Sequence, residues 1–340
     1  MEQQIKEYLQ KYNMIYIPIP DEYILNIHNL FFKDIIQEVD DGTVLLYYGV
    51  YYNIKKDDTM LKCYMRAIEL NNTFAMINLA SYYELKGDET NVVKYCSMAI
   101  VLNNHYAMNY FAQYHERRLN YDDAVKYYLM AIKRGNFYAM DNLAQYYRDK
   151  NDYDNAEKYY LMAITYDYPN SMNNLAVLYG RHSNCLLAEK YYVMAIEHGH
   201  TQAMDNLARY YTRQEDNDNA TKYYLMAINH NHLDSLPCLA EHYERQGSIE
   251  LAMKYWLLDV DHGNYGYVKH VTCLCKRRKL TDWGIVYANR ILNKVLNEEF
   301  IVKFIKHYIG KAGQDVVNII VNGELCDNGL FQKYKQLVIY

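Results

Sequence analysis

The heptapeptide KYYLMAI occurs three times in this chain, and this repetition constrains the fold more than any other feature. The copies begin at Lys126, Lys158 and Lys222, and a near copy, KYYVMAI, begins at Lys190. The alanine of each copy belongs to a column that recurs every 32 residues: Ala67, Ala99, Ala131, Ala163, Ala195 and Ala227. Self-similarity at a period of about 20 to 50 residues indicates a solenoid, in which each repeat packs mainly against its neighbours.

Two further columns share this period. One contains Leu79, Phe111, Leu143, Leu175, Leu207 and Leu239, and the next contains Ala80, Ala112, Ala144, Ala176, Ala208 and Ala240. Within one repeat the apolar residues follow helical spacing in two stretches, Ala139-Leu143-Ala144-Tyr147 and Ala156-Tyr160-Ala163. We expect Asp154 to cap the second helix, and Gly135-Asn136 to end the helix before this repeat. The alternation of small and bulky columns favours helix pairs that interlock.

This order of residue classes resembles the tetratricopeptide repeat, and the turn AIKRGNFYAMDNLA is similar to that of the Sel1-like relatives of that family. The resemblance covers about Thr43 to Glu298 as eight repeats, of which the first and last are degenerate. It implies an all-α, right-handed superhelix of antiparallel helix pairs that serves as a protein-interaction scaffold. We expect residues 1–42 and 299–340 to form helical caps at the two ends.

Composition restricts the other classes of protein. A hydrophobic fraction of 51% is ample for a core, and a formal charge of −5 argues against a nucleic-acid partner. The seven cysteines are mostly isolated, no secretory signal is present, and no apolar run is long enough to cross a membrane. We therefore expect a cytoplasmic protein. The Asn-, Ile-, Lys- and Tyr-rich wording also resembles repeat proteins of large DNA viruses of amoebae, which would place the chain in the host cytoplasm.

No catalytic or cofactor signature stands in the sequence, so we expect neither an enzyme nor a bound cofactor. The cluster His270, Cys273 and Cys275 lacks a second pair at zinc-site spacing, and we expect no metal there. A lysine column could suggest a phosphate-binding track. Acidic residues precede five of these lysines by four positions, which predicts surface ion pairs on the second helices instead.

An arginine column lies near the end of the first helices and comprises Arg117, Arg181, Arg213, Arg245 and Arg277. One interpretation is a cation that stabilises the carboxyl end of a helix. The other is an arginine edge that receives acidic groups of a partner. The sequence leaves both open.

An asparagine column stands immediately before the leucine column and comprises Asn78, Asn142, Asn174 and Asn206; Tyr110 interrupts it and Cys238 ends it. The resemblance implies that first helices line a concave groove, where such asparagines would hold the backbone of an extended peptide. An amide offers both a donor and an acceptor to a peptide group. The neighbours expected to tune specificity are Asp141, Asp205, Gln113, Gln145 and Arg209. The alternative is that the asparagines hydrogen-bond within the scaffold.

Ahead of the repeats, the segment Ile19–Ile27 resembles the opening of an F-box, the helical motif that docks onto a ubiquitin-ligase adaptor. Two functions follow. The first is a non-catalytic scaffold that binds a protein or extended peptide on its groove. The second is an adaptor whose N-terminal segment recruits a ligase while the repeats select the substrate.

Overall fold

The computed structural model describes residues 40–182 and 184–264, together with isolated residues between 266 and 278. These residues form 14 helices and no strand: α4 (Gly42–Ile54), α5 (Thr59–Glu69), α6 (Thr73–Leu85), α7 (Glu89–Val101), α8 (His105–Arg117), α9 (Tyr121–Ile132), α10 (Phe137–Asp149), α11 (Tyr153–Ile164), α12 (Pro169–Arg181), α13 (Cys185–Glu197), α14 (Thr201–Arg213), α15 (Asn217–Asn229), α16 (Ser235–Arg245) and α17 (Ile249–Asp261). The F-box-like segment and the expected C-terminal cap lie outside the described residues.

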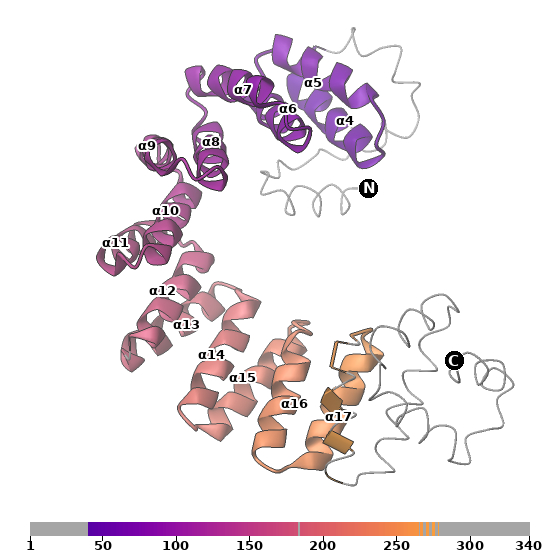
Figure 1. Cartoon of the computed structure of the whole chain (residues 1–340), viewed down its shortest axis with the longest axis vertical. Coiled ribbons are helices and arrows are strands. Elements are labelled where there is room, and N and C mark those ends of the chain that lie inside the picture. Colours follow the sequence, from indigo (N-terminus) through magenta and orange to yellow (C-terminus); the bar gives the residue numbers. More distant parts are fainter. Residues whose placement is uncertain are drawn as a thin grey trace, which may run out of the picture. The chain divides into compact units, whose positions relative to one another are not determined.

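Consecutive helices pack as pairs, which confirms the expected all-α solenoid (Figure 1). The first helix of each pair carries an even label and the second an odd label. Each second helix also contacts the first helix of the next pair, as α5 does with α6 and α15 with α16. First helices of successive pairs contact one another as well, as in α6 with α8 and α14 with α16. We call this contact between successive first helices a seam.

The chain divides into two compact units, and the division falls inside α12, between Ser171 and Met172. The first unit contains the pairs from α4 to α11. The second unit contains most of α12 and the helices from α13 to α17.

The core is built from the repeated alanine, leucine and tyrosine columns. Every alanine of both predicted columns has an exposed fraction of 0%. Tyr128 and Tyr160 of the second helices are also fully buried, and Trp256 fills the same column in α17. The first pair departs from the pattern because Tyr47 and Tyr48 replace the leucine and alanine, and both are buried. A side chain at Gly49 would overlap the Tyr64 ring, 2.3 Å away, so a glycine is required there.

The helix ends show where local sequence acts. The expected cap at Asp154 is wrong: Asp152 is the N-cap of α11 and accepts from the N–H of Asn155, whereas Asp154 lies in the first turn. Gly135 takes a left-handed conformation (φ 78°) after α9, which fits its expected role as a helix stop. Asn136 then begins α10, because its side chain caps the N–H of Ala139.

The lysine column does not form the expected ion pairs with the acidic residues four positions earlier. No such pair lies within 4.0 Å in the described helices. Instead, each lysine from Lys94 to Lys254 lies 5.0–5.7 Å from the ring of the tyrosine that follows it. That tyrosine stacks on a first-helix aromatic ring of its own pair; Tyr147 and Tyr159, for example, stack with centroids 5.7 Å apart. The lysines thus belong to a cation–π arrangement repeated on the second helices.

Candidate peptide-binding surface

Two asparagines of the predicted column take part in the seams between first helices. The Nδ2 of Asn142 donates to Oδ1 of Asn109 at 2.9 Å in the first unit. The Nδ2 of Asn206 donates to Oδ1 of Asn173 at the same distance in the second unit. Asn142 and Asn206 are both half-buried, and neither Oδ1 accepts a hydrogen bond within the described chain. Each amide therefore keeps an acceptor and one N–H for another molecule.

The other positions of the column differ. Asn78 is 7% exposed and its Nδ2 donates to the Tyr64 hydroxyl at 3.4 Å, so this side chain serves the core. Asn174 is half-buried and interacts within the chain. Tyr110, which interrupts the column, donates its hydroxyl to Glu84 at 2.6 Å.

Asp141 and Asp205 do not face outward as expected for specificity residues. Both are 4% exposed. The Oδ1 of Asp141 accepts from the hydroxyl of Ser171 at 2.6 Å, and Asp205 accepts from Ser235 in the same way at 2.7 Å. Because a buried carboxylate requires such partners, these aspartates join successive first helices rather than meet a ligand.

The seams consequently alternate in chemistry. An Asn109–Asn142 contact is followed by Asp141–Ser171, and Asn173–Asn206 is followed by Asp205–Ser235. The same arrangement recurs after two repeats, and only the 32-residue period was evident from the apolar columns.

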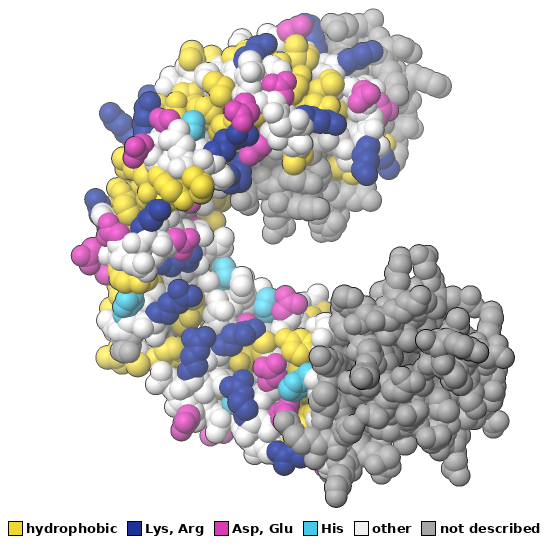
Figure 2. Space-filling view, viewed as in Figure 1, with side chains coloured by type: hydrophobic (Ala, Val, Ile, Leu, Met, Phe, Trp, Pro, Cys, Tyr) yellow, Lys and Arg dark blue, Asp and Glu magenta, His cyan; other side chains and the backbone are white. Residues whose placement is uncertain are grey.

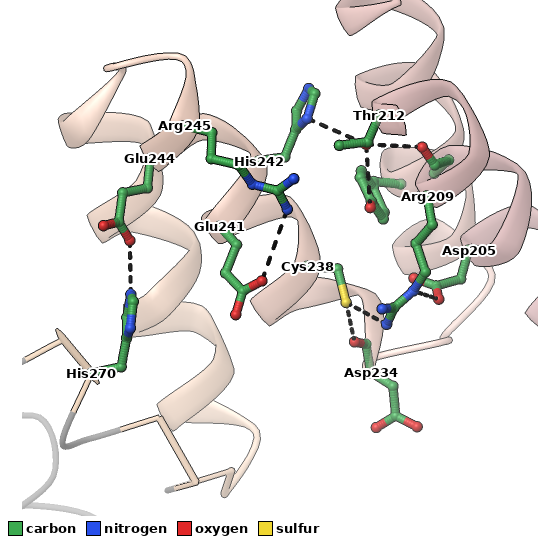
Figure 3. A network of polar contacts seen from close by, with 12 residues as sticks. Asp205, Arg209, Thr212, Asp234, Cys238, Glu241, His242, Glu244, Arg245 and His270 are labelled. Atoms are coloured by element: carbon green, nitrogen blue, oxygen red, sulfur yellow. Dashed lines mark hydrogen bonds and ion pairs between the residues drawn. The ribbon is translucent and has the colours of Figure 1, made fainter. Parts of the chain in front are cut away.

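The remaining predicted neighbours lie one helical turn farther along. Gln145 donates to Oδ2 of Asp141 at 2.7 Å, and Gln113 is half-buried without a hydrogen-bond partner in the described chain. Arg209 occupies the position of Gln145 two repeats later. Its Nε donates to Asp205 at 2.6 Å and its Nη2 lies 2.7 Å from Sγ of Cys238 (Figure 3). Burial raises the pKa of Cys238 to about 11, so this thiol stays protonated at neutral pH.

A buried histidine beside this network was missed by sequence reasoning. His242 is 1% exposed; its Nε2 lies 2.7 Å from Nε2 of Gln246, and its Nδ1 lies 3.4 Å from the Thr212 hydroxyl (Figure 3). Burial lowers the pKa of His242, and a neutral ring can accept from Gln246 while it donates to Thr212. Since histidines occur at many positions in this chain, the sequence carried no signal for it.

The arginine column divides into closed and open members. Arg117 is closed, contrary to the expectation of an open edge, because its Nε and Nη2 donate to the two carboxylate oxygens of Glu84 at 3.0 and 2.8 Å. Arg181 and Arg213 are exposed and form no ion pair within the described chain. Arg245 has one distant carboxylate, Glu241, at 4.0 Å. Figure 2 shows Lys and Arg side chains gathering over α12 to α15.

Metal and membrane sites were also sought in the described part of the chain. No group of three or more potential ligands there could hold a metal ion, and Cys273 lies outside the described residues. His270 instead lies 2.8 Å from a carboxylate oxygen of Glu244 (Figure 3). Among the described helices, none combines the length and apolar character that crossing a bilayer requires.

Comparisons with known proteins agree with this architecture. The tetratricopeptide repeat family matches residues 139–171. A Sel1 repeat protein from Oxalobacter formigenes is 13% identical over 95% of each chain, with a TM-score of 0.51. The fold is that of a Sel1-like α-solenoid. Yeast Tom70 is 19% identical over 90% of this chain and 61% of its own, with a TM-score of 0.52. No curated protein matches the sequence.

Proposed function

We propose that this solenoid is a non-catalytic scaffold that binds an extended segment of a protein partner along its first helices. The observation that carries the proposal is the state of Asn142 and Asn206. Each is held in place by one hydrogen bond from the preceding first helix and retains an unused acceptor and donor. A preorganised amide of this kind loses little side-chain freedom on binding a peptide group.

The surface defined by these contacts is smaller than the sequence suggested. It comprises Asn142 with Gln113 and Gln145 in the first unit, and Asn206 with Arg209 in the second. Asn174 belongs to the same column of the second unit and is kept as a further contact. Asn78, Asp141 and Asp205 are left out because their side chains are buried in the scaffold.

The test requires a peptide that binds the full chain, selected from a random displayed library and then labelled for fluorescence anisotropy. If asparagines hold main chain, N-methylation of the peptide backbone should weaken binding more than alanine replacement of most of its side chains. Asn142→Ala combined with Asn206→Ala should weaken binding by about tenfold or more, as for the loss of two hydrogen bonds.

Asn109→Ala combined with Asn173→Ala is the matched control, because it removes the same two seam contacts but leaves the candidate peptide contacts in place. Circular dichroism should show equal helicity for both double variants. If the two double variants lost peptide affinity equally, the asparagines would act only through the scaffold and the proposal would be wrong.

A further inference from the structure

The closed arginine of the first unit shows which group this edge of the solenoid accepts. Arg117 at the end of α8 reaches back to Glu84, which lies 33 residues earlier near the end of α6. The same carboxylate accepts the hydroxyl of Tyr110. A guanidinium and a phenol thus converge on one carboxylate, and this geometry gives the strongest form of the Arg–carboxylate pair.

The corresponding place in the second unit contains the arginine but lacks the carboxylate. Arg213 ends α14 as Arg117 ends α8, and the residue 33 positions before it is Gly180 in α12. Gly180 has no side chain that could close the guanidinium. Arg181, the next residue of α12, is likewise exposed and without an ion pair in the described chain.

A buried hydroxyl lies beside these two arginines. Tyr192 of α13 is 4% exposed, and its hydroxyl has no hydrogen-bond partner in the described chain. In neighbouring pairs the equivalent hydroxyl meets a side chain at the position of Gly180: Tyr128 donates to Glu116 at 2.6 Å, and Tyr224 lies 3.5 Å from Thr212. Burial raises the pKa of Tyr192 to about 12, and the positive charges of Arg213 and Arg181 act in the opposite direction. Both arginines therefore lie near this phenol.

We propose that Arg181, Arg213 and the Tyr192 hydroxyl form a carboxylate-binding site, left open by Gly180, for an aspartate or glutamate side chain of an extended partner. The partner carboxylate takes the place that Glu84 occupies beside Arg117. This assignment deepens the proposed scaffold function by naming the chemistry of a partner residue. It does not depend on the asparagine contacts, because none of its three groups belongs to them.

The decisive variant is Gly180→Glu, which supplies the missing carboxylate within the chain. A Cβ at Gly180 would lie 3.5 Å from the Tyr210 ring and 3.8 Å from Ala188, both ordinary contacts, so the backbone can accept a side chain there. Glutamate also favours the helix more than glycine does. Gly180→Gln is the matched control, because it adds a side chain of the same size without the charge.

The probe is a fluorescein-labelled peptide of about eight glutamates, which is long enough when extended to cross a seam, with the glutamine peptide as reference. We expect the full chain to bind the glutamate peptide and Gly180→Glu to weaken that binding about tenfold or more, as for the loss of a charge-assisted contact. Gly180→Gln should bind as the parent does. Arg213→Gln should weaken binding, and Arg117→Gln should not, because Arg117 is already closed.

Three outcomes would overturn the assignment. They are unchanged binding in Gly180→Glu, equal loss in Gly180→Glu and Gly180→Gln, and tighter binding of the glutamine peptide. A phosphoserine peptide that binds and is unaffected by Gly180→Glu would also contradict it. Loss of binding in the Asn142→Ala and Asn206→Ala variant with an unchanged Gly180→Glu would reject this site and keep the scaffold proposal; the reverse result would do the opposite.

Discussion

The side chain of Asn136 joins two consecutive helix pairs. Its Oδ1 caps α10 by accepting from the N–H of Ala139, while its Nδ2 donates to the backbone carbonyl of His105 at the start of α8. Asn72 makes the same double contact one pair of helices earlier, with Ala75 and with Gly42. A single amide thus fixes both the start of a helix and its distance from the preceding first helix.

Replacement of Asn136 should separate these two roles. Asn136→Ala removes both contacts and should lower the free energy of unfolding by about 1 to 3 kcal/mol, since the residue is 1% exposed. Asn136→Ser keeps a capping oxygen but is too short to reach His105, so it should cost less. Urea denaturation followed by circular dichroism measures both. Equal losses for serine and alanine would show that the contact to His105 contributes nothing.

Ala144→Leu should destabilise the first unit by about 1 to 3 kcal/mol, because Ala144 is completely buried where two helices meet. Ala176→Leu should do the same in the second unit, where Ala176 is equally buried. Thermal melts of the two variants provide the measurement. Melting temperatures equal to the parent's would contradict the assignment of this alanine column to the core.

Leu119→Gly should stabilise the protein. Leu119 is 71% exposed and has a left-handed backbone (φ 60°) in the turn after α8, so its side chain buries little and strains the turn. Glycine adopts this conformation without strain, and the expected gain is up to about 1 kcal/mol. Gly87→Ala, at the equivalent turn after α6 (φ 73°), is the reverse control and should cost a similar amount. A loss of stability in Leu119→Gly would refute this account.

Asp259 should make stability depend on pH. This residue stands in the alanine column of α17 and is 3% exposed, and burial raises its pKa to about 6. Asn264 donates to its Oδ1 at 3.0 Å and lowers that pKa, the charge of Asp234 raises it, and His262 lowers it. The folded chain therefore holds a proton that the unfolded chain releases near pH 4.

The sign follows from this difference in pKa. The stability that the raised pKa contributes is present below about pH 4 and is lost as the pH rises to about 6, and the loss is on the order of 1 to 3 kcal/mol. Asp259→Asn should remove this component. Unfolding free energies of the parent and the variant, measured across this window, give the comparison. A difference between the two proteins that stays constant with pH would exclude Asp259 as its source.

The periodic columns predicted the helix pairs and their buried alanines because burial in a solenoid depends on spacing alone. The fate of the polar residues depended on distances between helices, which a sequence does not contain. Asn78 and Asn142 share a column, yet one is buried against Tyr64 and the other lies at a seam. Arg117 and Arg213 likewise look equivalent until Glu84 and Gly180 are compared 33 residues before them. That comparison needed the knowledge that these two positions meet.

The alternation of Asn–Asn and Asp–Ser seams has a consequence for how such an array can change its length. Excision of 32 residues would place an aspartate where the next helix offers an amide, or an asparagine opposite a serine, and would leave a buried carboxylate without its hydroxyl donor. Excision or duplication of 64 residues would restore the same partners at the junction. The unit of inheritance for this surface is therefore a block of four helices, and recombination should lengthen or shorten the chain in those steps.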